Sequence, residues 1–196
     1  MIFFATSDCV RANENPQEIQ NRAASEKNDS LGTRSFHILQ FLHTLGTLTL
    51  PPESQWEYAC RAGTKTPFSF GETISPDQVN FDGNHPYGDS PKGEYREETV
   101  EVKSLSANRW GLYEMHGNVW EWCSDWYAEY SPEPQIDPTG PATGSYRVMR
   151  GGGWDYGARG VRSAFRYWFA PGDRSSDLGF RLLSSASPDR NQPPNK

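Results

Sequence analysis

Apolar residues in this chain stand in short segments separated by long polar stretches, and their spacing predicts the elements. Between Ser35 and His43 the apolar residues occupy positions 36, 38, 39, 41 and 42, which suits one face of a helix. The preceding residues, 1–34, are polar and aperiodic, so we expect them to be mobile. Pro52 to Arg61 predicts a second short helix, because proline stands near its first turn and Gly63 follows its end.

Short strands are predicted farther along the chain. The run from Tyr146 to Arg150 alternates and ends at three glycines, which predicts a strand leading into a tight turn. Gly179 to Leu183 predicts a final strand, and Val100 to Val102 predicts a shorter one. Residues 64–98 are rich in Gly, Pro, Asn and Asp and predict a long surface loop, whereas residues 186–196 predict a polar tail.

The composition favours large aromatic anchors over long regular elements. Only 35% of the 196 residues are hydrophobic, whereas 13% are aromatic, and there are 18 glycines and 15 prolines. Such a chain is expected to fold into loops held by aromatic side chains. We therefore predict an irregular α+β domain with short strands and few short helices.

Charge and cysteine content narrow the classes of partner and the compartment. The net charge of −6 gives no basic surface for nucleic acid, and no apolar run is long enough to span a membrane. The first five residues lack a basic region and are too short for a secretion signal, so a cytoplasmic location is the default expectation. Cys9, Cys60 and Cys123 are scattered without metal-binding spacing, which favours reduced thiols.

The segment from Asn108 to Trp126 is the densest in chemistry. It holds four tryptophans, and each needs a prepared place in a core. Gly111 and Gly117 permit backbone angles that other residues resist. Between and after these glycines, the segment offers carboxylates together with carbonyl groups, a mixture of oxygen ligands that calcium prefers.

Four sequence blocks resemble the formylglycine-generating-enzyme, or sulfatase-modifying-factor, family, and they occur in the family's order. The central block is Gly111-Leu-Tyr-Glu-Met-His-Gly-Asn-Val-Trp-Glu-Trp122, and the others are Leu50–Gly63, Arg147–Trp154 and Arg162–Leu182. The resemblance implies an irregular, loop-rich C-type-lectin-like domain over residues 47–185, preceded by a poorly matched segment, 1–46. Full-length members carry a longer N-terminal half, so we expect that half to be truncated or divergent here.

The resemblance also indicates what chemistry is missing. The family's known oxidation of a sulfatase cysteine to formylglycine depends on two cysteines and copper. Tyr156 and Val161 occupy those two positions here, and Gly153 replaces the serine of the preceding block. Because thiolates are the ligands suited to Cu(I), we expect neither copper nor formylglycine generation, and we assign no catalytic residue. Cys60 matches a disulfide position of some relatives whose partner position is Arg166, so we expect a buried, inert thiol.

Calcium is the metal that the resemblance supports. It assigns one site to the Trp-rich segment, with the ligands Glu114 and Glu121 (side chains) and Gly117 and Val119 (carbonyl groups). A second site would use Asn80 and the carbonyl group of Phe81, with ligands near Glu94 and Arg96. The alternative for Glu121 is an ion pair with a buried arginine such as Arg162 or Arg166.

Other polar residues have simpler interpretations. The arginines recur among aromatic residues and glycines, which favours structural clamps over an anion-binding site; they are Arg150, Arg162, Arg166, Arg174 and Arg181. His85 and His116 lack partners at metal-binding spacing, so we expect surface or hydrogen-bonding roles.

Three functions remain open from the sequence. The first is a non-catalytic, calcium-supported scaffold that binds a protein client or small ligand through a recognition surface between residues 154 and 177. That surface would comprise Asp155, Tyr156, Arg159, Tyr167, Trp168, Phe169 and Asp173. The second is an enzyme, either an oxidase that modifies a client protein or a partner chain of the iron-dependent sulfoxide-synthase type. The third is a fragment without independent function.

Overall fold

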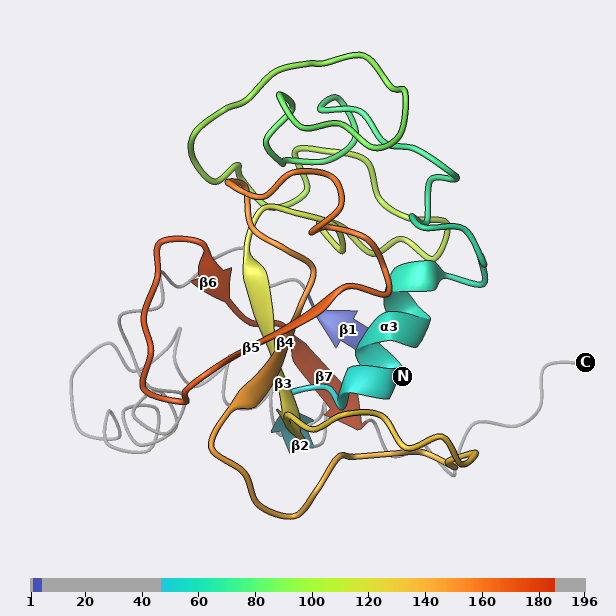
Figure 1. Cartoon of the computed structure of the whole chain (residues 1–196), viewed down its shortest axis with the longest axis vertical. Coiled ribbons are helices and arrows are strands. Elements are labelled where there is room, and N and C mark those ends of the chain that lie inside the picture. Colours follow the sequence, from blue (N-terminus) through green and yellow to red (C-terminus); the bar gives the residue numbers. More distant parts are fainter. Residues whose placement is uncertain (1, 5–46, 186–196) are drawn as a thin grey trace, which may run out of the picture.

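The computed structural model describes residues 2–4 and 47–185 (Figure 1). The predicted helix at Ser35–His43, Cys9 and the predicted tail at 186–196 lie outside the described residues. Within the described part, no helix is long and apolar enough to cross a membrane.

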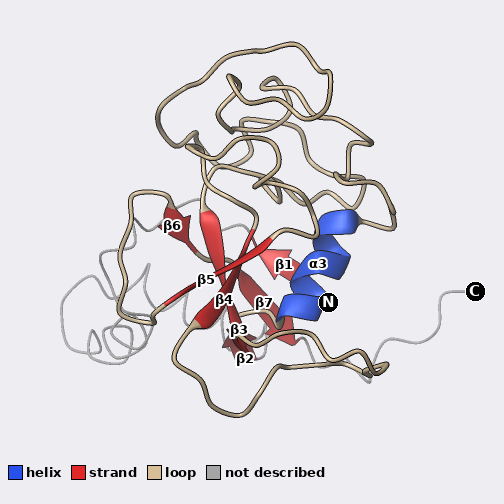
Figure 2. Cartoon of the chain, viewed as in Figure 1, coloured by secondary structure: helices blue, strands red, loops and turns tan. Residues whose placement is uncertain are grey.

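Two small sheets form the regular framework. The first is antiparallel with strand order β1-β7-β2, made of β1 (Ile2–Phe4), β2 (Thr47–Thr49) and β7 (Leu182–Ser185). The second has strand order β5-β4-β3-β6, made of β3 (Trp120–Trp126), β4 (Arg147–Arg150), β5 (Arg166–Phe169) and β6 (Leu178–Gly179). β3 pairs antiparallel with β4 and parallel with β6. Loops make up most of the rest, as Figure 2 shows, which confirms the irregular, loop-rich α+β prediction.

The predicted second helix is confirmed as α3, which spans Glu53–Arg61. Proline at position 52 has no side-chain acceptor to cap the helix, and the Asp125 carboxylate at the end of β3 accepts the Glu53 N–H at 2.8 Å instead. The helix ends at Ala62, which adopts a left-handed conformation. Its apolar face buries Trp56 and Cys60 in a core shared with Cys123 and Val148.

The strand predictions have mixed outcomes. β4 confirms the predicted strand at Tyr146–Arg150, one residue shorter. The predicted final strand is divided into β6 and β7, with an interruption between them. The predicted strand at Val100–Val102 was wrong: the Asn118 side chain accepts the Val100 N–H at 2.9 Å and donates to the Val100 carbonyl group at 3.3 Å, so these groups are unavailable for a ladder. No strand was predicted at β3, because the Trp-rich segment was interpreted as a source of oxygen ligands for calcium.

The stretch 64–98 contains no helix or extended strand, as predicted, but it is more than a surface loop. Four of its apolar side chains form a second core with Ala158 and Val161; they are Phe68, Ile74, Val79 and Phe81. In Figure 1 this stretch lies at the top of the molecule, above the four-stranded sheet. It therefore forms a packed layer that covers the turn leading into β3.

Candidate functional site

The turn that leads into β3 brings the two predicted calcium regions together. Gly117 and Asn118 both have left-handed backbone angles, with φ of 71° and 66°. A β-carbon at Gly117 would lie 2.1 Å from the Asn80 carbonyl oxygen, so only glycine allows this approach. The Asn118 N–H donates to that same oxygen at 2.8 Å. Residues far apart in the sequence are thereby joined at one point.

Asn80 has a buried oxygen that lacks a partner among the described residues. Its amide nitrogen donates to the Glu98 carbonyl group at 2.9 Å and to Asn118 Oδ1 at 3.1 Å. Its Oδ1 is buried and accepts no hydrogen bond. A buried polar atom without a partner is costly, and a cation is one group that would satisfy it.

Glu121 has a different environment, because both of its carboxylate oxygens already face a guanidinium group. Arg181 donates to Glu121 Oε2 at 2.5 Å and to Oε1 at 2.6 Å, and the indole of Trp56 adds a hydrogen bond to Oε2 at 2.6 Å. Both charged residues are about 5% exposed. Glu121 therefore forms an ion pair with a buried arginine, which was the expected alternative to calcium binding. The arginine is Arg181 rather than Arg162 or Arg166.

Glu114 lies at the outer side of the same turn. Its carboxylate accepts the Lys103 N–H at 3.0 Å, and burial raises its pKa. Arg181 also donates to the Tyr113 and Glu114 carbonyl groups, at 3.1 and 3.3 Å. The guanidinium group of Arg181 therefore supplies positive charge to the loop that was predicted to hold calcium. Across residues 48–183, no three His, Cys, Asp or Glu side chains gather as a metal site, so a cation here would depend on amide and carbonyl oxygens.

The two positions that hold cysteine in formylglycine-generating enzymes are filled by packed side chains. Tyr156 contacts Trp120 edge-on, with 5.0 Å between the ring centroids, and Val161 is completely buried. A β-carbon at Gly153 would lie 2.7 Å from Asp177 Oδ2 and 2.8 Å from Asp155 Oδ1. The adjoining carboxyl groups therefore leave little space at position 153 for the serine that the family pattern has there.

The two described cysteines are free, buried thiols. Burial raises the pKa of Cys60 to about 12 and raises that of Cys123 well above its ordinary range. Because only the thiolate is a good nucleophile or copper ligand, both groups are poorly suited to redox chemistry. For Cys60 this agrees with the expected inert thiol.

His116 is a buried hydrogen-bonding residue next to Cys60. Its Nδ1 lies 2.8 Å from the Val161 carbonyl oxygen, and its Nε2 accepts the Ser69 N–H at 3.1 Å. These partners assign the proton to Nδ1, since Nε2 is an acceptor. Burial lowers its pKa to about 4, so the ring is neutral near pH 7. His85, in contrast, is largely exposed and pairs with Asp82 at 2.7 Å.

Two of the predicted arginine clamps are confirmed at the start of α3. Arg150 is completely buried and binds Glu53 at 3.2 Å, the Glu57 carboxylate and the Ser163 carbonyl group. Arg166 binds both oxygens of Glu53, at 2.8 and 2.6 Å. Arg162 instead donates to the Arg159 carbonyl group, and Arg174 is exposed.

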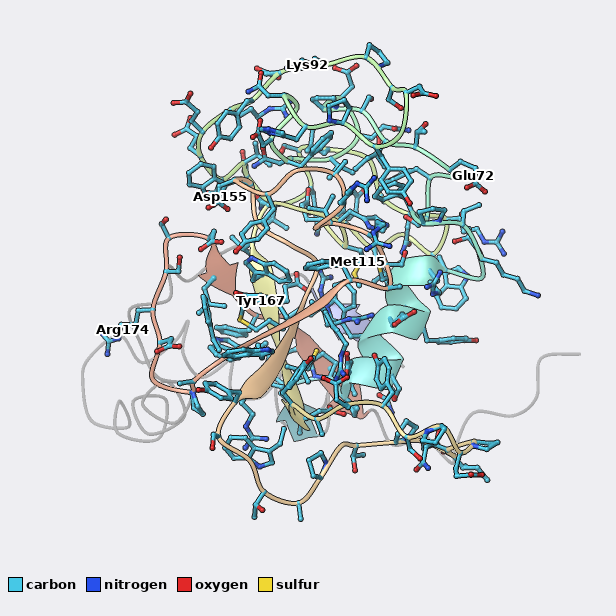
Figure 3. The ribbon with its side chains drawn as sticks, in the orientation of Figure 1. Glu72, Lys92, Met115, Asp155, Tyr167 and Arg174 are labelled. Atoms are coloured by element: carbon cyan, nitrogen blue, oxygen red, sulfur yellow. The ribbon has the colours of Figure 1, made fainter. Side chains whose placement is uncertain are left out.

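The predicted recognition surface is partly exposed and partly built into the core. Tyr167 stacks on Trp168 with 5.8 Å between the ring centroids, and Trp168 is 37% exposed. Asp155 and Arg159 are exposed, whereas Tyr156 is half-buried. The exposed Asp173 accepts the Ala170 N–H at 2.9 Å. In Figure 3, Asp155 and Tyr167 both lie on the side of the molecule away from α3.

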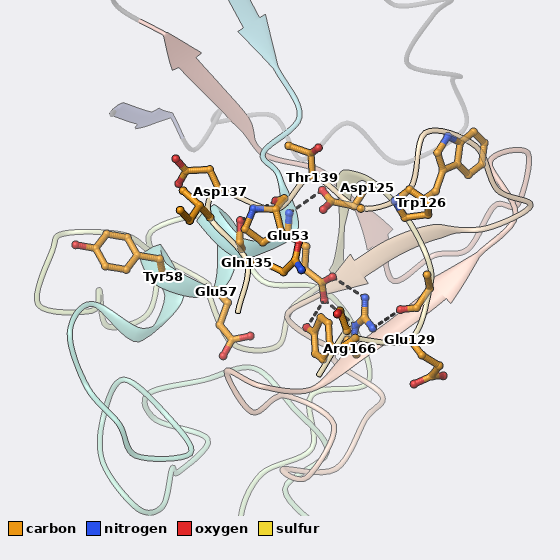
Figure 4. A pocket seen from close by; sticks show the side chains of 18 of the residues that line it. Glu53, Glu57, Tyr58, Asp125, Trp126, Glu129, Gln135, Asp137, Thr139 and Arg166 are labelled. Carbon is orange, nitrogen blue, oxygen red and sulfur yellow. Dashed lines mark hydrogen bonds and ion pairs between the residues drawn. The ribbon is translucent and has the colours of Figure 1, made fainter. Parts of the chain in front are cut away.

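The sequence did not reveal a pocket of about 820 Å³ between α3 and residues 128–141 (Figure 4). Its lining comes from the length of α3, the end of β3, the following loop and Arg166. In the sequence, Glu53 and Glu57 stand one helical turn apart, which could have indicated an acidic site on this helix. Nothing in the sequence showed that Arg150 and Arg166 would pair with them.

Residues 18–186 match the family described as the sulfatase-modifying factor enzyme 1-like domain. The match covers most of the 196 residues, so the chain belongs to this family. The family predicted from the four sequence blocks is thereby confirmed.

Its relatives include proteins with different names. The chain is 40% identical over 137 residues to the serine/threonine-protein kinase pkn1 of Chlamydia caviae, covering 67% of the chain and 20% of that protein. It is 37% identical over 147 residues to the formylglycine-generating enzyme of Streptomyces coelicolor, covering 70% and 46%. The solved structure of Treponema denticola variable protein 1 matches with a TM-score of 0.59 and 38% identity, covering 69% and 46%. The chain thus spans between a fifth and about half of these relatives.

Proposed function

We propose that this chain is a non-catalytic, calcium-supported domain that binds a protein or small ligand through the surface around Asp155, Arg159 and Trp168. The observation that carries the proposal is the lack of sulfur at positions 156 and 161, where Tyr156 and Val161 are packed into aromatic and aliphatic cores. Thiolates are needed there to bind Cu(I), and neither residue supplies one.

The remaining thiols do not offer a simple replacement. Cys60 and Cys123 are completely buried, and their raised pKa values oppose the thiolate form. Moving either sulfur to positions 156 and 161 would require the aromatic core around Trp120 to rearrange. The domain therefore keeps the family scaffold while its described residues lack a pair of accessible sulfur ligands.

The relatives support a binding role in a general way. The chain resembles parts of proteins named as a kinase and as a variable protein about as closely as it resembles the named formylglycine-generating enzyme. The scaffold thus occurs in proteins that carry other names. Trp168, Tyr167 and Arg159 are residue types that are enriched in recognition surfaces.

For calcium, the better-fitting region is the one around Asn80. Asn80 Oδ1 is a hard oxygen, buried and without a hydrogen bond, and the Phe81 carbonyl group follows it in the chain. These residues would hold the ion, which would tie the 64–98 stretch to the turn at Gly117. The region around Glu114 and Glu121 fits less well, because a cation there would lie beside the Arg181 guanidinium group.

We expect calcium to raise the thermal stability of the full chain. A ligand that binds only the folded state at 100 times its Kd adds about 2.7 kcal/mol. For a domain of this size, where 1 kcal/mol shifts the midpoint by about 2–4 °C, the midpoint should rise by roughly 5–11 °C. Asn80→Ala should remove this increase, which is measured by calorimetry in calcium and in EDTA.

The matched control is Asn118→Gly, which breaks the hydrogen bond from Asn80 but leaves Asn80 Oδ1 in place. Glycine suits the left-handed backbone at this position. This variant should be less stable yet still respond to calcium. If the wild-type midpoint is the same in calcium and in EDTA, the calcium part of the proposal is wrong.

Oxidation of a client cysteine is the second candidate function, and the 37% identity with the Streptomyces coelicolor formylglycine-generating enzyme favours it. The test incubates the purified chain with Cu(I), oxygen and a peptide containing Cys-x-Pro-x-Arg. We expect no aldehyde by mass spectrometry and no copper retained after desalting. Formation of formylglycine at a rate above the copper-only control would overturn the non-catalytic proposal.

A further inference from the structure

The pocket beside α3 is lined by more negative than positive charge. Five carboxylate side chains and two guanidinium groups contribute to it, namely Glu53, Glu57, Asp125, Glu129, Asp137, Arg61 and Arg166. Figure 4 shows Glu53 and Arg166 at its centre, Tyr58 and Asp137 on one side, and Trp126 and Glu129 on the other. With a volume of about 820 Å³, the pocket falls in the size range of ligand sites.

The positive groups of the pocket are already paired. Arg166 binds Glu53 with two hydrogen bonds and donates a third to the Ala128 carbonyl group at 2.7 Å. Arg61 binds Glu57 at 2.7 Å and the Thr66 carbonyl group at 3.2 Å. An anionic ligand would therefore have to break these pairs to find a cation.

Three carboxylates are left without a positive partner among the described residues: Asp125, Glu129 and Asp137. Asp125 is the informative one, because it is only 4% exposed and yet lines the pocket. Its Oδ2 accepts the Glu53 N–H at 2.8 Å and contacts the Ser124 hydroxyl, whereas its Oδ1 has no hydrogen-bond donor within the described residues. Burial raises the pKa of this carboxyl group and the nearby Glu53 carboxylate adds to the rise, although Arg166 partly offsets it.

Two aromatic rings near these carboxylates already contact arginine side chains of the protein itself. The Arg166 guanidinium carbon lies 4.0 Å from the ring centroid of Tyr130, and that of Arg147 lies 3.6 Å from the ring centroid of Trp126. Tyr58 is 63% exposed at the pocket edge. Carboxylates combined with aromatic side chains are the usual surroundings of guanidinium and ammonium groups.

We propose that this pocket binds an organic cation with a guanidinium or primary ammonium group, which contacts Asp125 inside the pocket and Glu129 and Asp137 at its edge. The site lies at the far end of β3 from the turn at Gly117, and it uses none of the residues of the recognition surface in the proposed function. It is a second binding site that is independent of calcium.

The test titrates the full chain by calorimetry with three probes. The peptide acetyl-Gly-Arg-Gly-amide carries the guanidinium group, its citrulline counterpart is neutral and nearly equal in shape, and spermidine represents a free polyamine. We expect saturable binding of the arginine peptide or of spermidine, and binding of the citrulline peptide at least tenfold weaker. A preference for the arginine peptide assigns the cation to a protein side chain, and a preference for spermidine assigns it to a polyamine.

Variants then locate the site. Asp125→Asn should weaken binding at least tenfold, and Glu129→Gln with Asp137→Asn should weaken it severalfold without touching the buried network. Asp89→Asn removes the same charge from an exposed position outside the pocket and should leave the affinity unchanged. The proposal is overturned if the citrulline peptide binds as well as the arginine peptide, if no probe binds, or if Glu129→Gln/Asp137→Asn binds like wild type.

Discussion

Several buried charged side chains of this protein are held by specific partners of opposite charge. Glu121 takes its hydrogen bonds from Arg181 and Trp56, and Arg150 divides its guanidinium group between Glu53 and Glu57. Removing one partner of such a pair leaves a buried charge uncompensated, which typically costs several kcal/mol. These residues are therefore explained by the fold itself and need no ligand.

His116 should make stability depend on pH in an identifiable window. Its pKa is about 4 in the folded protein, against 6.5 ordinarily, because burial disfavours the charged ring. Between these values the unfolded chain binds more protons, so the free energy of unfolding falls as the pH falls from 6.5 to 4. The full effect is on the order of 3 kcal/mol.

His116→Gln removes this titration. At pH 7 the variant should be less stable by about 1–3 kcal/mol, since hydrogen bonds to Ser69 and Val161 are disturbed. Urea unfolding at several pH values gives the difference between the two proteins, and other titrating groups cancel in that difference. The gap should narrow or reverse toward pH 4; a constant gap would mean that His116 is protonated normally in the fold.

At the scale of elements, side chains from distant segments make the backbone hydrogen bonds that local sequence would otherwise supply. Asp125 at the end of β3 caps α3, since Pro52 cannot. The Asn118 side chain binds the backbone of Val100, and so prevents the predicted strand there. Each of these side chains joins two segments that lie apart in the sequence, so the segments depend on one another for stability.

The turn at Gly117 offers the sharpest test at this scale. Gly117→Ala would place a β-carbon 2.1 Å from the Asn80 carbonyl oxygen in a left-handed backbone, and we expect a loss of roughly 3 kcal/mol or more. Gly88→Ala is the matched control, because φ is 60° there and no atom lies within 4 Å. It should cost only about 1–2 kcal/mol. Chemical denaturation compares them, and equal losses would contradict the close approach to Asn80.

At the scale of the whole molecule, the sequence predicted the family, the loop-rich α+β class, α3 and β4, because these depend on local patterns and specific motifs. It missed β3 because the Trp-rich segment was interpreted as a source of calcium ligands, although Trp120, Trp122 and Trp126 stand an even number of residues apart, as on one face of a strand. It also missed the Arg181 partner of Glu121 and the pocket below α3. Those features arise where segments more than 50 residues apart meet, as Glu121 and Arg181 do across 60 residues, and no single-sequence pattern encodes such meetings.

The three-stranded sheet has a consequence for how the chain comes to be folded. β7 lies between β1 and β2, so both of these earlier strands find their hydrogen-bonding partner in a segment that follows them by well over 100 residues. During translation, Ile2–Phe4 and Thr47–Thr49 leave the ribosome long before Leu182–Ser185 is made. This sheet therefore cannot close before β7 has been made, and until then both earlier strands are open to capture by chaperones or by other nascent chains.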